Sequence, residues 1–181
     1  MSREIGPVRI GNCSGFYGDR HSAMREMLTG GELDYVTGDY LAELTMLILA
    51  RDRAKSPDRG YAKTFLTQLE ECLGLALERG VKIVANAGGL NPAGLAAAVR
   101  ALADRLGLDA KVAHVEGDDL VSRAAELGFD PGTLSANAYL GAWGIVDCLT
   151  AGADVVVTGR VTDASVLVGP AAAHFGWSRT D

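Results

Sequence analysis

Short apolar, β-branched runs alternate along the chain with longer segments of helical periodicity. The runs lie at residues 8–10, 33–36, 81–84, 111–115 and 154–157. Between them, leucines recur at three- and four-residue spacing, as at Leu66, Leu69, Leu73 and Leu77, which is typical of a helix with one buried face. This alternation predicts βα units. We expect an α/β fold with a mostly parallel sheet of about five strands and flanking helices, Rossmann-like, with a partial βα-barrel as the second choice.

Glycine is the unusual count, with 23 in 181 residues. Six of them fall where a helical pattern stops, as helix terminators do, and together with glycines in turns they account for about half of the total. These stops are Gly30, Gly31, Gly80, Gly107, Gly128 and Gly152. The charged residues 51–60 predict an exposed loop between two helices. No change of composition marks a domain boundary, so we expect one α/β domain over residues 1–181.

Charge and cysteine content exclude several classes of protein. The formal charge is −6, and no basic run stands out, which disfavours nucleic-acid binding. Apolar stretches are too short to span a bilayer, and residues 1–7 carry no leader-like apolar run, so we expect a cytoplasmic protein without membrane contact. The three cysteines, Cys13, Cys72 and Cys148, lack the spacing of a zinc site or of a disulfide framework.

Most candidate chemistry follows the predicted strands, where parallel α/β sheets bind ligands. The first loop, residues 11–20, has G-x3-G-x2-G spacing, one residue longer than the dinucleotide fingerprint, so we expect no NAD(P). It is a candidate for binding an anion on backbone amides. The alternative is a plain turn in which Asp19 caps the next helix. The candidate residues of this loop are Ser14, Gly15, Gly18, Asp19 and Arg20.

The second and third loops offer carboxylates and an amide. Asp39 and Glu43 are four residues apart, so on a helix start they share one face and are candidates for acid, base or hard-metal ligand. Complementing the helix dipole is the equal alternative. In the third loop, Asn91 before Pro92 predicts a helix cap. Its candidate ligand contacts are Asn86, Gly88 and Gly89.

The fourth and fifth loops carry the remaining charges. Glu116, Asp118 and Asp119 repel one another, and a divalent metal or a cationic group would relieve this; a solvated turn with a capping aspartate is the favoured alternative. In the fifth loop, Arg160 is the best candidate for holding a carboxylate or phosphate. A structural pair of Arg160 with Asp163 is equally favoured. Thr162 and Asp163 complete this set of candidate substrate contacts.

Three further residues have mainly structural interpretations. Cys13 is a candidate nucleophile near a helix start, where a thiol pKa falls, but a small buried side chain is the favoured interpretation. Asn137 and Tyr139 lie in a segment of small residues for which close packing is the better explanation, although a position facing the pocket remains open.

Several segments together resemble the N-terminal domain of the acyclic terpene utilisation protein A (AtuA) family. They are IGNCSGFYGDR, LDYVTGDYLAELTM, VKIVANAGGLNP, HVEGDD, LSANAYLGAWGIVDCLTAGADVVVTGRVTDAS and VGPAAAHFGW. The resemblance runs in order through nearly the whole chain. It implies a role in the catabolism of acyclic terpenoid or branched acyl compounds, in pathways that use coenzyme A thioesters. Members of the family continue further, so the resemblance implies that these 181 residues are the N-terminal part of a longer domain.

The leading hypothesis is therefore a catabolic protein that binds a small acyl or acyl-CoA substrate at the carboxyl edge of the sheet. Arg160 and residues 15–20 would hold the anionic group. Asp39, Glu43 and Asp118 would act as acid, base or metal ligands, with hydratase or lyase chemistry. The alternative is a non-catalytic assembly subunit, either a homo-oligomer or a complex with a chain that supplies the rest of the family domain. A nicotinamide-dependent oxidoreductase is the third hypothesis.

Overall fold

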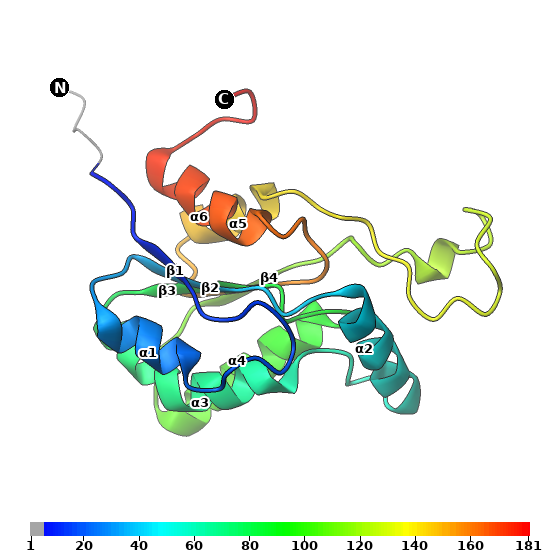
Figure 1. The fold of residues 1–181 in the computed structure, drawn as a ribbon, viewed down its shortest axis with the longest axis horizontal. Helices are drawn as coiled ribbons and strands as arrows, with labels where there is room; N and C mark the ends of the chain where they lie inside the picture. The colour runs from blue at the N-terminus through cyan, green and yellow to red at the C-terminus, as the bar shows by residue number, and fades with distance from the viewer. Residues whose placement is uncertain (1–5) are drawn as a thin grey trace.

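A computed structural model describes residues 6–181, and its centre is a sheet of five parallel strands (Figure 1). Residues 1–5 of the N-terminal stretch considered above lie outside the described residues. The sheet order is β1-β2-β3-β5-β4, so β5 lies between β3 and β4. The strands are β1 (Ile10–Asn12), β2 (Tyr35–Gly38), β3 (Lys82–Ala85), β4 (Val112–Val115) and β5 (Val155–Thr158). The predicted Rossmann-like α/β fold is confirmed, and over residues 6–181 the sheet stays open, with β1 and β4 as its edges.

The helices divide between the two faces of the sheet, as Figure 1 shows. Right-handed crossovers explain the division. The chain advances in one direction from β1 to β4, which puts three connecting helices on one face, and it then turns back to β5, which puts the last two on the other. The first three are α1 (Ala23–Gly30), α3 (Lys63–Glu78) and α4 (Pro92–Leu106); the others are α5 (Trp143–Thr150) and α6 (Ser165–Phe175).

β5 supplies the centre of the core because its three valines are fully buried. Val155 and Val157 pack with the residues of α1, α3 and α4, whereas Val156 packs on the opposite side with Ile145 of α5. This alternation follows from the two-residue period of a strand. Fully burying each of these valines contributes about 1.5–3 kcal/mol.

The observed strands begin one or two residues later than the apolar runs predict. Two aspartates that precede their own strands bind backbone amides just before the neighbouring strands. Asp34 accepts from the amide of Arg9 at 2.7 Å, and Asp154 accepts from the amide of Lys111 at 2.9 Å. These two amides are therefore paired with side chains and not with ladder partners. Each carboxylate ties the start of its own strand to the start of the neighbouring one.

Two helix boundaries illustrate the local sequence rules. Asn91 caps α4 as predicted, because its side chain accepts from the amide of Gly94 at 2.9 Å and Pro92 is the first helical residue. Gly107 ends the same helix with φ +68°, the left-handed conformation that favours glycine. The loop predicted at residues 51–60 is wrong in its first half. Residues 51–55 belong to α2 (Glu43–Lys55), whose Asp52 pairs with Arg59 at 3.3 Å.

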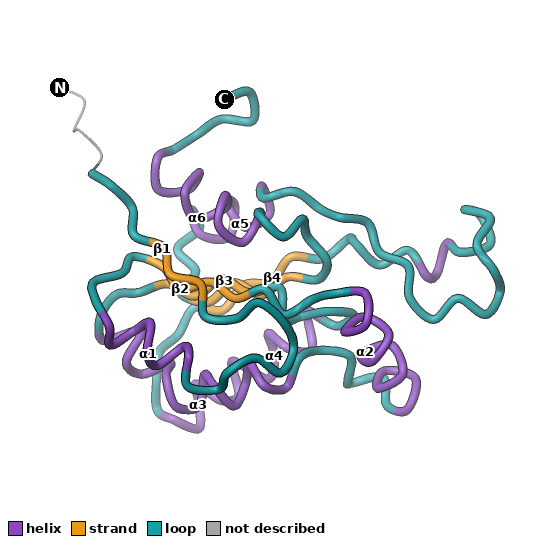
Figure 2. Tube along the Cα trace, viewed as in Figure 1, coloured by secondary structure: helices purple, strands orange, loops and turns teal. Residues whose placement is uncertain are grey.

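Residues 116–142, between β4 and α5, form an extended arm that projects beyond the sheet (Figure 2). The arm contains one 3₁₀ turn, η1 (Val121–Arg123), and Gly128 ends a turn here and not an α-helix. An antiparallel bridge between Asp119 and Asn137 joins the two sides of the arm, and a parallel bridge between Leu140 and Val161 joins its end to the loop after β5. Among the described residues, no helix has the length and apolar character needed to cross a membrane.

Candidate functional site

The carboxyl ends of β3 and β5 form a topological switch point. The loop after β3 leads to α4 on one face of the sheet, and the loop after β5 leads to α6 on the other. In open parallel α/β sheets, the crevice at such a point is the usual place for a ligand. Asn86 follows β3 and Arg160 follows β5. The sheet order therefore brings two of the predicted candidates to this crevice.

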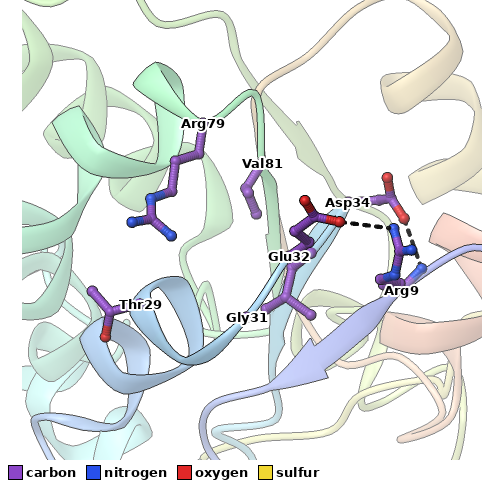
Figure 3. A pocket seen from close by; sticks show the side chains of 8 residues that line it. Arg9, Thr29, Gly31, Glu32, Asp34, Arg79 and Val81 are labelled. Atoms are coloured by element: carbon purple, nitrogen blue, oxygen red, sulfur yellow. Dashed lines mark hydrogen bonds and ion pairs between the residues drawn. The ribbon is translucent and has the colours of Figure 1, made fainter.

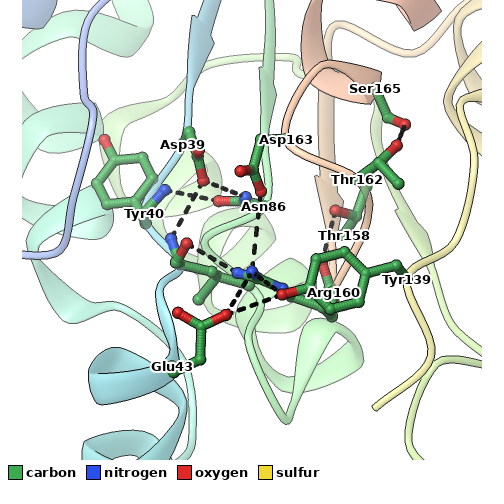
Figure 4. A network of polar contacts seen from close by, with 12 residues as sticks. Asp39, Tyr40, Glu43, Asn86, Tyr139, Thr158, Arg160, Thr162, Asp163 and Ser165 are labelled. Carbon is green, nitrogen blue, oxygen red and sulfur yellow. Dashed lines mark hydrogen bonds and ion pairs between the residues drawn. The ribbon is translucent and has the colours of Figure 1, made fainter.

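Arg160 lies at the centre of the polar network in Figure 4 and is only 5% exposed. Its Nη1 donates to the carbonyl of Leu41 at 2.8 Å, and its Nη2 donates to the hydroxyl of Tyr139. The same Nη2 is 3.5 Å from Glu43 Oε1 and 3.8 Å from Asp163 Oδ1. The predicted pair with Asp163 is thus present but long. Buried charges must be compensated, and here compensation comes from three loops.

Tyr139 links the cation to the carboxylate beside it. Its ring lies 4.3 Å from the Arg160 guanidinium carbon, and its hydroxyl donates to Glu43 Oε1 at 3.0 Å. Hydrogen bonds from the Glu43 backbone amide and from Tyr139, together with the charge of Arg160, lower the pKa of Glu43. A pocket of about 170 Å³ opens here, lined by Glu43, Met46, Ser135, Asn137, Tyr139 and Arg160. Glu43 therefore faces the pocket as a carboxylate at neutral pH.

Asp39 and Asn86 form a second unit of the network (Figure 4). Asn86 Nδ2 donates to Asp39 Oδ1 at 2.6 Å, and Asn86 Oδ1 accepts from the amide of Tyr40 at 2.7 Å. Asn86 is fully buried, and these two hydrogen bonds let its side-chain amide hold the turn after β2 in place. Burial raises the pKa of Asp39, although the hydrogen bond from Asn86 opposes the shift. A half-buried carboxyl with a raised pKa is suited to proton donation.

Asp118 is 2% exposed and lies behind the pocket. Its Oδ2 accepts from the backbone amide of Arg160 at 2.7 Å and from Asn137 Nδ2 at 2.8 Å. Burial raises its pKa, and these two donors oppose the shift. A side chain on Gly159 would collide with this carboxylate. Asp118 therefore positions the loop of Arg160 and does not line the pocket itself.

The three candidate metal ligands of the fourth loop point into different surroundings. Asp119 pairs with Arg53 of α2 at 2.6 Å and accepts from the amide of Val121, whereas Glu116 is exposed and lies 3.7 Å from His114. Asp118 is buried, as described above. Across residues 6–181, no three histidine, cysteine or acidic side chains gather in a way that could hold a metal ion. The capping alternative is wrong for Asp119 as well, because Leu120 is the residue that precedes η1 and its side chain forms no capping hydrogen bond.

The first loop is closed by its own carboxylate. Asp19 accepts from the amide of Gly15 at 2.9 Å and from the amide of Arg20, which lowers its pKa. Arg20 pairs with Glu26 at 2.7 Å on the surface. The Gly15 amide is thus already paired, which does not favour an anion there. The alternative that Asp19 caps α1 is wrong, because the helix begins at Ala23. Ser14 is buried, and Gly18 has φ +99° with open space around it.

Gly88 and Gly89 lie against protein atoms and not against open space. A Cβ on Gly88 would lie 2.5 Å from the carbonyl oxygen of Thr158, and one on Gly89 would lie 2.8 Å from the carbonyl oxygen of Gly60. Gly88 thus lets the loop after β3 pass close to the end of β5, and Gly89 lets it pass close to the chain at Gly60. Thr162 is exposed three residues before α6, and its hydroxyl contacts that of Ser165, the first residue of the helix.

Cys13 matches the interpretation as a small buried side chain. It belongs to the main core cluster, and burial raises the pKa of its thiol to about 12. Because the thiolate is the nucleophilic form, this environment does not activate the residue.

A hollow of about 480 Å³, larger than the pocket beside Arg160, lies at the opposite edge of the sheet, before the strands begin (Figure 3). It is lined by exposed residues of both charges: Arg9 pairs with Glu32 at 3.7 Å, and Arg79 donates to the carbonyl of Leu28 at the end of α1. Size alone does not make it the better candidate, because ligands of parallel α/β sheets bind at the other edge.

Comparison with protein families identifies the chain. The model of the family described as "Acyclic terpene utilisation family protein AtuA" matches residues 8–181. The chain belongs to this family. Searches of curated proteins and of solved structures return no match. The family description connects the AtuA-family chain with the utilisation of acyclic terpenes, and the predicted resemblance is confirmed.

In this AtuA-family chain, the least expected participant is Tyr139. The small residues around it in the sequence predict a side chain packed in the interior. Instead, Tyr139 is 52% exposed, and its hydroxyl is hydrogen-bonded to both Arg160 and Glu43. The only signal in the sequence is its place shortly before a helix, within a long segment without periodicity. Met46 and Ser135, which also line the pocket, carry no signal of chemistry at all.

Proposed function

We propose that the pocket beside Arg160 binds the acyl end of a small branched acyl compound, as a free acid or as a coenzyme A thioester, during the breakdown of acyclic terpenoids. The observation that carries this proposal is a buried guanidinium at the switch point, with an exposed tyrosine and glutamate on its open side. A guanidinium recognises a carboxylate or a carbonyl oxygen through its N–H groups. The family membership supports the substrate class.

The size of the pocket limits what enters it. At about 170 Å³, it is smaller than the ~300–1,000 Å³ pockets that enclose a complete drug-sized ligand. It therefore takes the reacting end of the substrate, and the remainder of a thioester lies on the surface. Met46 supplies an apolar contact in the wall for a hydrocarbon chain.

The arrangement supports acid–base chemistry of the hydratase or lyase type. Glu43, with its lowered pKa, is the base that takes a proton from the carbon next to the carbonyl group. Arg160 and Tyr139 donate to the carbonyl oxygen, where negative charge develops. Asp39 is the proposed donor of the proton with which a β-hydroxyl group leaves as water; its raised pKa supports this role, although Asp39, like Asp118, is not part of the pocket wall. In this scheme Asp118 acts as a positioning residue.

The experiment measures binding and turnover separately. Purified protein is titrated with branched acyl acids and their coenzyme A thioesters, and thermal shift and conversion are recorded. Glu43→Gln should keep binding and lose conversion, and Tyr139→Phe should weaken binding by about tenfold at most. Glu26→Gln is the matched control, because Glu26 also lies in the first turn of a helix and pairs with an arginine. It should change neither.

Two results would overturn the proposal. One is that no acyl compound in either form binds to the folded protein. The other is that Arg160→Lys and Tyr139→Phe both leave affinity unchanged while the fold is intact.

A second candidate function, an assembly subunit, is favoured by exposed apolar side chains around α6. Leu167 and Val168 of α6 and Trp177 beyond it are each more than a third exposed. Light scattering of the purified chain tests this function. A monomer that converts substrate excludes it, whereas a chain that becomes active only in an oligomer supports it.

A further inference from the structure

The outward stripe of α2 combines apolar and cationic side chains. Leu44, Ile48, Arg51 and Lys55 are spaced by four, three and four residues, so they lie on one face of the helix. All four are exposed, Leu44 by 69% and Ile48 by 44%. The outer face of a surface helix is normally polar throughout. Here it begins apolar beside the candidate site and becomes cationic away from it.

The positive charge of this region contrasts with the rest of the chain. Residues 51–63 hold five of the 17 lysines and arginines but only two aspartates, in a chain of net charge −6. Asp52 is already paired with Arg59 and with Lys63, at 3.3 and 3.4 Å. Within residues 6–181, neither Arg51 nor Lys55 has a carboxylate partner. Like charges four residues apart destabilise a helix, and a bound anion would remove that repulsion.

A hollow of about 360 Å³ lies beside these cations. Its wall includes Tyr17 from the loop after β1, Ile48, Arg51, Asp52 and Lys55 from α2, and Lys63 at the start of α3. Three separate elements thus bring basic groups and an aromatic ring around one concave surface. Lys63 adds charge that its pair with Asp52 only partly offsets.

The stripe is continuous with the candidate site. Glu43, which lines the acyl pocket, directly precedes Leu44, and the helix rises 1.5 Å per residue, so Lys55 lies about 16 Å further along. A flexible linker lying over Leu44 and Ile48 would connect a group in the acyl pocket with an anion at the cations.

We propose that Arg51 and Lys55 form a phosphate-binding subsite for the phosphorylated carrier of a thioester substrate, with its linker over Leu44 and Ile48. The position of the acyl end rests on the proposed function, but the residues of the phosphate subsite, Arg51 and Lys55, do not line the acyl pocket. It therefore has its own test.

The test uses coenzyme A without an acyl group, so that the acyl pocket makes no contribution. Calorimetry compares coenzyme A with dephospho-coenzyme A, at low and at high salt. The test variant is Arg51→Gln/Lys55→Gln. The control variant is Arg105→Gln/Lys111→Gln, which removes the same charge from exposed positions outside the stripe.

We expect coenzyme A to bind more weakly at high salt, and the test variant to lose about tenfold in affinity while the control loses none. Tyr139→Phe should leave this binding unchanged, even if the acyl proposal fails. Equal affinity in the two double variants, or no binding by the unmodified protein, would overturn the subsite. Binding to vesicles that contain phosphatidylserine, lost in the test variant and without coenzyme A binding, would assign the stripe to a membrane surface instead.

Discussion

The backbone amide of Arg160 donates to the buried carboxylate of Asp118 at 2.7 Å, which joins the loop after β5 to the base of the arm. Asn137, on the returning side of the arm, donates to the same oxygen. One side chain thus holds three segments, and the direction of the Arg160 side chain depends on it. Asp118→Ala should cost about 1–3 kcal/mol of stability, because the buried amide of Arg160 and the part-buried amide of Asn137 lose their acceptor. Chemical denaturation measures the loss.

The pH dependence of Asp118→Asn should carry a definite sign. Burial raises the pKa of Asp118 above its ordinary value of 3.8, so the folded protein binds the proton more tightly than the unfolded chain. The unmodified protein therefore loses stability as pH rises from about 3.8 through the raised pKa. The variant does not titrate there, so its stability relative to the unmodified protein should improve over the same range.

Glu126→Gln, on the same arm, provides a comparison of opposite sign. The hydrogen bond from Arg123 lowers the pKa of Glu126. The stabilisation is present above the ordinary pKa of 4.5 and is lost as pH falls through the lowered pKa. The difference between this variant and the unmodified protein should shrink on acidification. If the stability differences of the two variants from the unmodified protein changed with pH in the same direction, the assignment of opposite pKa shifts to Asp118 and Glu126 would be contradicted.

Tyr139→Phe should change the titration of Glu43 without unfolding the protein. The Glu43 amide lowers the pKa of this carboxyl most, and Tyr139 adds the next contribution. Removing the hydroxyl should move the pKa upwards, towards its ordinary value of 4.5, and leave the first contribution in place. Carbon-detected nuclear magnetic resonance of the side-chain carboxyl measures this shift. An unchanged pKa would mean that the hydrogen bond does not persist in solution.

Gly88→Ala should destabilise the fold by about 1–3 kcal/mol, because the new Cβ meets the Thr158 carbonyl oxygen at 2.5 Å and the Pro92 Cα at 2.8 Å. Both neighbours belong to the backbone and cannot rotate away. Gly141→Ala is the control: no atom lies within 4 Å of its added Cβ and its φ is not positive. We expect a change within about 0.5 kcal/mol there. Thermal melting of both variants makes the comparison.

Cys13 should resist alkylation in the folded protein. Its thiol pKa of about 12 leaves almost no thiolate at neutral or mildly basic pH, and burial restricts access. Mass spectrometry after iodoacetamide treatment should therefore find Cys13 unmodified until denaturant is added. Rapid native modification would revive the nucleophile interpretation.

The sequence predicts where the helices and strands lie along the chain better than it predicts which strands are neighbours in the sheet. Apolar runs locate all five strands, and Asn91-Pro92 locates the start of α4, because these signals are local. No local signal indicates that β5 enters between β3 and β4. Fold-class rules place Arg160 and Asn86 at one edge, but only the sheet order makes them neighbours. Tyr139 reaches the site along an arm without periodicity, so no pattern predicts it.

The insertion of β5 also determines when the sheet formed by residues 6–181 can assemble during synthesis. Among these residues β4 pairs only with β5, and β5 is the last of the five described strands to be made. A nascent chain that has not reached Val155 can assemble β1, β2 and β3, but its β4 and the arm have no strand to join. Within the described sheet, the crevice that holds Arg160 therefore forms only after β5 has been made, when α1, α3 and α4 are already present in the chain.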